Sequence, residues 1–205
     1  MHEYETRKLS FQLVPLTSWY INLRSILPNW AEISSKVRST TQCDICGQKT
    51  NMLEAHEIWE YDDAHSLQKL QRVIAVCRDC HQSIHIGYSL VSGKYNEAIA
   101  HYIKINQIPD YVAKVDEEVA FFVWNKRCTH NWKIDKKQIT DTILHQLGIT
   151  CDFGKSINGR FYAQVYFDEK EEAKIYGAKW DRNRKMWYFP SEVIRSRWNE
   201  MKNRE

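Results

Sequence analysis

The sequence of 205 residues lacks any apolar run of the length, about 18 residues, that a membrane-spanning helix needs. Its first residues, MHEYETRKLS, lack the apolar segment of a secretory signal peptide. Internal repeats and low-complexity tracts are also missing, and the formal net charge is only +3, a weak indication of a polyanionic partner. These absences leave no candidate membrane span, and we expect a cytoplasmic protein.

The composition is that of a globular chain, with 43% hydrophobic and 27% charged residues. The length suits one medium domain or two small ones. We divide the chain into a lead-in over 1–40 that packs on the next part, a cysteine- and histidine-containing domain over 41–150, a linker over 151–158, and a small basic, aromatic domain over 159–205. The predicted fold class is α+β.

Hydrophobic spacing predicts helices that flank the cysteine-rich region. Ile33 and Val37, four residues apart, favour a helix over 31–38. Two further stretches, 94–105 and 110–125, also have helical periodicity, and the valines of the second fall on one face.

Four of the six cysteines form two C-x-x-C pairs, Cys43/Cys46 and Cys77/Cys80. Two such pairs at this separation are typical of a tetrahedral zinc site, and four thiolates complete the coordination sphere, so the metal would be structural. Gly47 suits the tight turn because glycine readily adopts positive φ. Buried free thiols or two disulfides are the alternatives.

Three histidines are spaced to share a second metal ion. His81 and His85 lie four residues apart, directly after Cys80, and would lie on one face of a helix. His56 lies within an apolar segment, 53–59, that predicts a strand, and 72–76 predicts a second strand. The order strand, strand, helix predicts a ββα element around a metal, pinned at its ends by the four-cysteine zinc. A second structural metal, or histidines that only cap and pack, is the alternative.

The segments EAHEIWEYDD and QKLQRVIAVCRDCHQSIHIG resemble the HNH (ββα-metal) endonuclease family, and the later HYIKIN and FFVWNKR extend the likeness to bacterial and phage HNH-type proteins over about 7–135. The resemblance implies a zinc-stapled ββα-metal module and a metal-dependent DNA endonuclease from a phage, plasmid or bacterial defence system. Its cofactors would be one structural zinc and one divalent catalytic metal: Zn, Ni, Co, Mn or Mg, of which Mg suits imidazole ligands least.

Residue by residue, the resemblance makes His56 the strand ligand and His81 and His85 the helix ligands of the catalytic metal. Glu57 stands where the family usually places a general-base histidine, and Arg72 stands where it places the asparagine that orients this base. A carboxylate can also accept a proton from water, but Glu57 could equally occupy the open metal position and silence the site. Arg72 could instead hold a phosphate oxygen.

In the implied reaction the metal stabilises the leaving 3′-oxygen and a base activates water, which leaves a 5′-phosphate and a 3′-hydroxyl. His65, in the loop between the predicted strands, is a substitute candidate for the base.

The C-terminal part predicts a compact α+β unit. Tyr162–Phe167 alternates like a strand, Asp168 is a candidate N-cap for a helix over 169–176, and Gly177 would end that helix. Two further strands, 178–180 and 185–189, would flank the polar turn 181–184.

The pattern EK-x-x-AK-x-x-GA-K-W-D…K-x-W-Y resembles a small domain of unknown function seen beside plasmid and phage primase-like proteins. Cations interleaved with aromatics can bind phosphates and stack on bases. The candidate nucleic-acid contacts are Lys179, Trp180, Arg182, Arg184, Lys185 and Trp187. Alternatively, the two tryptophans form a small core.

Three functions remain open on the sequence alone. The first is a metal-dependent DNA endonuclease with an accessory nucleic-acid-binding domain, with RNA as the alternative partner. The second is a zinc protein that binds nucleic acid without cutting it. The third is a phage or plasmid protein–protein adaptor. Metal-dependent hydrolysis separates the first from the others, and steep salt dependence of DNA binding separates the second from the third.

Overall fold

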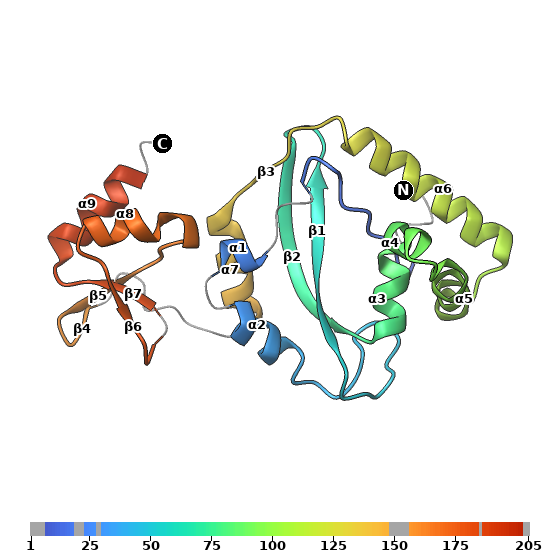
Figure 1. The fold of residues 1–205 in the computed structure, drawn as a ribbon, viewed down its shortest axis with the longest axis horizontal. Coiled ribbons are helices and arrows are strands. Elements are labelled where there is room, and N and C mark those ends of the chain that lie inside the picture. Colours follow the sequence, from blue (N-terminus) through green and yellow to red (C-terminus); the bar gives the residue numbers. More distant parts are fainter. Residues whose placement is uncertain (1–6, 19–22, 28–29, 148–155, 185, 203–205) are drawn as a thin grey trace. The chain divides into compact units, whose positions relative to one another are not determined.

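A computed structural model describes residues 7–18, 23–27, 30–147, 156–184 and 186–202 (Figure 1). The chain divides into two compact units. The first unit comprises Met1–Ile21 and Glu32–Ile143, and the second comprises Asn22–Ala31 and Leu144–Glu205. The fold class is α+β, as predicted, and the units are treated separately below.

A long β-hairpin forms the centre of the first unit. Strands β1 (Glu54–Asp62) and β2 (Leu67–Val76) pair antiparallel, with an irregularity between Ile58 and Trp59. The short strand β3 (Lys133–Ile134) adds in parallel beside β2. Both predicted strands are present, and both are longer than predicted. Strand β1 extends to Asp62, and β2 begins at Leu67 and not near Arg72, so the two meet at the turn 63–66.

Four helices follow β2 directly in the chain. They are α3 (Arg78–Ile84), α4 (Ile86–Val91), α5 (Tyr95–Asn106) and α6 (Asp110–Arg127), all drawn on one side of β1 and β2 in Figure 1. Of these, α3 contacts β1 and the others pack on neighbouring helices. The helices predicted over 94–105 and 110–125 are confirmed within two residues. The helix predicted to carry both His81 and His85 ends earlier, because the backbone turns away at His85, with φ −91° and ψ 50°, before α4 begins.

The segment after Arg7 is held on this core by hydrogen bonds. Asp116 on α6, 2% exposed, accepts hydrogen bonds from Arg7 Nε at 2.8 Å and Tyr102 Oη at 3.0 Å. The Asn106 side chain bonds both the N–H and the carbonyl of Leu9, at 3.0 Å and 2.8 Å. Since buried polar groups need partners, these contacts fix the segment beside α5 and α6.

Helix α2 (Trp30–Val37) matches the helix predicted over 31–38, and helix α7 (Lys136–Gln146) follows β3. Gln138 of α7 exchanges hydrogen bonds with the backbone of Leu70 in β2, at 2.7 Å and 3.1 Å. Among the helices of the described residues, none combines the length and apolar character needed to cross a membrane.

The second unit contains a four-stranded sheet in the order β4-β5-β7-β6. Its strands are β4 (Ser156–Ile157), β5 (Arg160–Ala163), β6 (Lys179–Asp181) and β7 (Met186–Phe189). Of the residues predicted to form a linker, Ser156 and Ile157 are part of this sheet, and 151–155 lie outside the described residues.

The helices of this unit are α1 (Leu23–Ile26), the 3₁₀ helix η2 (Phe167–Glu169), α8 (Lys170–Ile175) and α9 (Glu192–Lys202). The strand predicted over 162–167 is wrong beyond Ala163, where β5 ends, and Phe167 already belongs to the 3₁₀ helix η2.

The N-cap predicted at Asp168 is also wrong. The Tyr166 N–H donates to the Glu169 carboxylate at 2.8 Å, so the helical turn begins before Asp168. Gly177, with φ +84°, ends the helical segment as predicted.

Candidate metal centres

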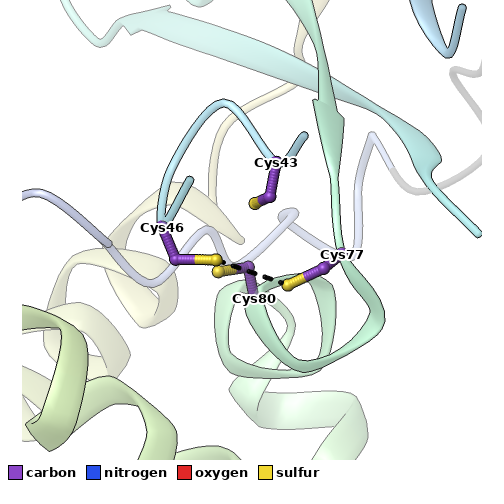
Figure 2. A group of neighbouring side chains, drawn as sticks. All are labelled: Cys43, Cys46, Cys77 and Cys80. Carbon is purple, nitrogen blue, oxygen red and sulfur yellow. Dashed lines mark hydrogen bonds between the residues drawn. The ribbon is translucent and has the colours of Figure 1, made fainter. Parts of the chain in front are cut away.

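The four paired cysteines meet at one end of the hairpin (Figure 2). Cys43 and Cys46 lie in the loop before β1, Cys77 directly follows β2, and Cys80 lies in α3. Their sulfur atoms all lie within 4.8 Å of one another, and Cys46 Sγ and Cys77 Sγ are 3.7 Å apart. Tetrahedral zinc with Zn–S bonds of about 2.3 Å requires S···S separations of about 3.8 Å. The thiols are free, so the disulfide alternative is not the one observed.

The backbone around the first C-x-x-C pair fixes this geometry. Gly47 has φ +74°, as expected from its place after Cys46, and its N–H donates to the Cys43 carbonyl at 2.9 Å. Asp44 is bonded twice to Ala75 of β2, through its N–H at 2.8 Å and its carboxylate at 2.7 Å. The turn is therefore tied to the strand that leads into Cys77.

The electrostatics of the cluster favour a cation. A hydrogen bond from the Cys80 thiol lowers the pKa of Cys43 to about 4 and raises the pKa of Cys80. Burial raises the pKa of Cys77 to about 11. The protein alone therefore stabilises few thiolates at neutral pH, and four thiolates together need a divalent ion. The cluster suggests a structural zinc with a complete ligand set.

His101 of α5 is a further member of this centre that the sequence reading missed. Its Nε2 lies 3.2 Å from Cys80 Sγ, close enough for the imidazole to donate to a thiolate. Hydrogen bonds of this kind orient ligands and reduce the charge on the sulfur. The only sequence signal was a histidine on the helix that follows the second C-x-x-C pair.

The three histidines also meet, at the junction of hairpin and helix. His56 lies on β1, His81 lies on α3, and His85 directly follows α3. Their nearest ring nitrogens lie within 4.8 Å of one another, and the ring centroids are 4.8–5.2 Å apart. The turn at His85 keeps its ring on the side of His81 despite the end of the helix.

His56 is 1% exposed, and neither of its ring nitrogens has a hydrogen-bond partner among the described residues. An unsatisfied buried polar group is costly, so a ligand is expected. Burial, assisted by His85 and His81, lowers the pKa of His56 to about 2, and burial lowers that of His85 to about 4. Both rings are therefore neutral at pH 7, the form that binds metal. The donor set fits a borderline-soft divalent ion.

Glu54 is the carboxylate beside this group. Its Oε2 hydrogen-bonds Nδ1 of His81. This contact leaves His81 Nε2 as the ligand atom, the arrangement of carboxylate–histidine–metal sites. The sequence reading missed Glu54, although its place two residues before His56 puts both side chains on one face of β1.

Three other residues were predicted for the histidine site, and the structure places each of them differently. Glu57 follows His56 on β1, so strand alternation directs its side chain to the opposite face. Arg72 is exposed and pairs with Ile58, on the same face as His56. His65 lies in the hairpin turn, bonded to Asp62, about 20 Å from His56 at the usual rise per strand residue. The interpretation of His65 as a substitute base is therefore wrong.

In the second unit the residues predicted to bind nucleic acid differ in how exposed they are. Trp187 is half-buried against the core of this unit, and Trp180 lies edge-on to it with ring centroids 5.4 Å apart, so the small-core alternative describes Trp187. Lys179, Arg182 and Arg184 are exposed. Lys185 lies outside the described residues.

Comparison with known families gives a match in the C-terminal part of the chain. Residues 160–199 match a family described as "Domain of unknown function (DUF5710)". This agrees with the resemblance of the C-terminal pattern to a small domain of unknown function. No HNH family matches. No curated protein and no solved structure matches the chain.

Proposed function

We propose that the first unit is a metal-dependent phosphodiester hydrolase of the ββα-metal type, with DNA as its substrate. The observation that carries the proposal is the convergence of His56, His81 and His85 where the hairpin meets α3. Three imidazole ligands leave open positions on a metal ion, as catalytic sites require, whereas the neighbouring four-cysteine cluster has none.

The roles of the residues follow from their positions. His56, His81 and His85 would hold a divalent ion, which would supply positive charge to stabilise a phosphate oxygen and the leaving 3′-oxygen. Glu54 orients His81. Arg72, exposed on the same face of the hairpin as His56, would bind a phosphate oxygen through its guanidinium fork.

Water activation is assigned to a carboxylate. Glu57 holds the family position of the base, but β1 directs it away from the histidines. The Gln12 side chain lies on the outer edge of β1 at this point, where it donates to the Glu57 carbonyl at 2.8 Å and accepts from the Trp59 N–H at 3.4 Å. A route from Glu57 to the histidines around this edge would have to displace Gln12. Glu57→Gln removes the proton acceptor and keeps the size of the side chain, so it tests this role directly.

The experiment is nicking of supercoiled plasmid under a scan of Mg, Mn, Co, Ni and Zn. His56→Ala and His81→Ala should abolish metal-dependent nicking. His65→Ala, at the far end of the same hairpin, is the matched control and should retain it. If nicking persists in His56→Ala and His81→Ala, it comes from elsewhere or from a contaminant, and the proposal is wrong.

A second candidate function is nucleic-acid binding without cleavage. It is favoured by Glu57 and Arg72, which stand in place of the family's histidine and asparagine. This candidate would be supported if none of the metals gives nicking, while the protein still retards DNA in a gel at low salt. The affinity for DNA should then fall steeply as salt rises.

A further inference from the structure

Helices α8 and α9 pack on one face of the sheet of the second unit (Figure 1). On that face the rings of Phe189 and Trp198 lie 6.1 Å apart in a common core. Because side chains alternate along a strand, Tyr188 points to the other face. Tyr162 and Lys179 pair with Tyr188 on the neighbouring strands and share that face.

A pocket of about 260 Å³ lies between the β4–β5 turn and the β6–β7 turn of this face. The β4–β5 turn is tight, with positive φ at Asn158 (52°) and Gly159 (71°). Most residues that line the pocket fall within the matched range 160–199. The lining consists of Ile157, Asn158, Arg160, Tyr162, Asp181, Asn183 and Arg184.

Asp181 organises the pocket. Its carboxylate, 6% exposed, accepts hydrogen bonds from Tyr162 Oη at 2.6 Å and Arg160 Nη1 at 2.7 Å. It also accepts from the backbone N–H groups of Asn183 at 3.0 Å and Arg184 at 3.1 Å. Four donors saturate the carboxylate, so it shapes the β6–β7 turn and presents little acceptor capacity to a ligand.

Two arginine side chains, Arg160 and Arg184, line the pocket. Arg160 lies over the Tyr188 ring at 4.8 Å, and Arg184 lies over the Tyr162 ring at 5.5 Å. Stacking on an aromatic face restricts a guanidinium before any ligand arrives. Arg160 gives one N–H to Asp181 and keeps 47% of its side chain exposed.

The acidic residues of the second unit lie mainly on its helices and not on its strands. Of the seven acidic residues between Ser156 and Lys202, Asp181 alone belongs to the strands, and it is buried. The other six lie in η2, α8 and α9: Asp168, Glu169, Glu171, Glu172, Glu192 and Glu200. Among the described residues between Ser156 and Lys202, the strands and turns around the pocket therefore expose cationic side chains and no acidic one: Arg160, Lys179, Arg182 and Arg184.

We propose that this pocket binds a phosphate group of a single-stranded nucleic acid, with Arg160 and Arg184 as its cations. A guanidinium group can bind two oxygens of one phosphate through parallel N–H···O bonds. Two cationic side chains repel a metal ion, so the ligand expected here is an anion. A guanidinium stacked on tyrosine offers a flat surface on which an unpaired base can stack. Binding at this pocket of the second unit would not depend on hydrolysis at the histidines of the first unit.

The test measures fluorescence anisotropy of a labelled single strand with the full chain, in buffer without added divalent metal. Arg160→Gln and Arg184→Gln should each weaken binding at least about fivefold. Each should also lower the slope of log affinity against log salt by about 0.7, the value for one phosphate contact on a single strand. Arg197→Gln on α9 removes the same charge from the helical side and should change affinity less than about twofold.

Two further arms identify the source of the phosphate. Equal affinity for strands with and without a 5′-phosphate, with competition by inorganic phosphate, assigns the pocket to backbone phosphates. A preference for the 5′-phosphorylated strand that Arg160→Gln removes assigns it to a strand end. Equal affinities of Arg160→Gln, Arg184→Gln and Arg197→Gln overturn the proposal. Near-UV circular dichroism checks folding, and the exposed Arg184 keeps the test decisive if Arg160→Gln unfolds.

Discussion

The carboxylate of Glu54 on β1 hydrogen-bonds Nδ1 of His81 on α3, which joins the hairpin to the helix at the candidate metal site. This contact fixes the tautomer of one ligand and so sets which nitrogen faces the ion.

Glu54→Gln should weaken binding of a divalent metal at the histidine site by about 10- to 100-fold, the usual cost of losing such a partner. Isothermal titration with Co²⁺ or Ni²⁺ measures the change. Glu60→Gln, an equal substitution near the other end of β1, should leave the affinity unchanged. Equal affinities in the two variants would show that Glu54 does not orient His81.

The purified protein should hold one tightly bound zinc at the four-cysteine cluster. A structural zinc contributes on the order of 10 kcal/mol to folding at neutral pH, so Cys80→Ser should release the ion and unfold the first unit. Elemental analysis and far-UV circular dichroism measure both effects. Cys128→Ser, outside the cluster, should retain the zinc. A zinc-free protein that remains folded would contradict the prediction.

Asp116→Ala leaves the partly buried Arg7 cation and the Tyr102 hydroxyl without their shared acceptor. Removal of one partner of such a pair costs about 3 kcal/mol, measured by urea unfolding of the zinc-loaded protein. Asp110→Ala breaks an exposed pair with Lys114 on the same helix and should cost less than about 1 kcal/mol.

The hydrogen bond from Tyr162, with the backbone N–H of Arg184, lowers the pKa of Asp181 to about 2 from its ordinary 3.8. A carboxyl group whose pKa is lowered by folding stabilises the fold fully above its ordinary pKa and loses that contribution as pH falls towards the lowered value. Acid should therefore loosen the second unit between about pH 4 and pH 2. The NMR signal of the Trp198 indole reports this loss.

Asp181→Asn provides the control for this pH dependence. The variant should be less stable at neutral pH and should show little change of its own in the same acid range. An acid transition in the variant identical to that of the parent chain would assign the effect to another group.

The sequence alone identified the residues of both candidate metal clusters. C-x-x-C spacing and the i, i+4 spacing of His81 and His85 are local constraints, so they specify which side chains share a turn. The strand–strand–helix order then placed His56 with them. The α+β class and the long helices followed from periodicity in the same way.

Tertiary packing decided what lies next to these residues. Glu54 reaches His81 across 27 positions of chain, His101 reaches Cys80 from a different helix, and Arg160 meets Asp181 across the intervening strand β7. Such contacts depend on strand register and helix docking, which no local pattern encodes. Strand alternation puts Glu57 and His56 on opposite faces of β1, and Tyr188 and Phe189 on opposite faces of β7. The packing of the helices then decided which of these faces is covered, and so which side chains are available to each site.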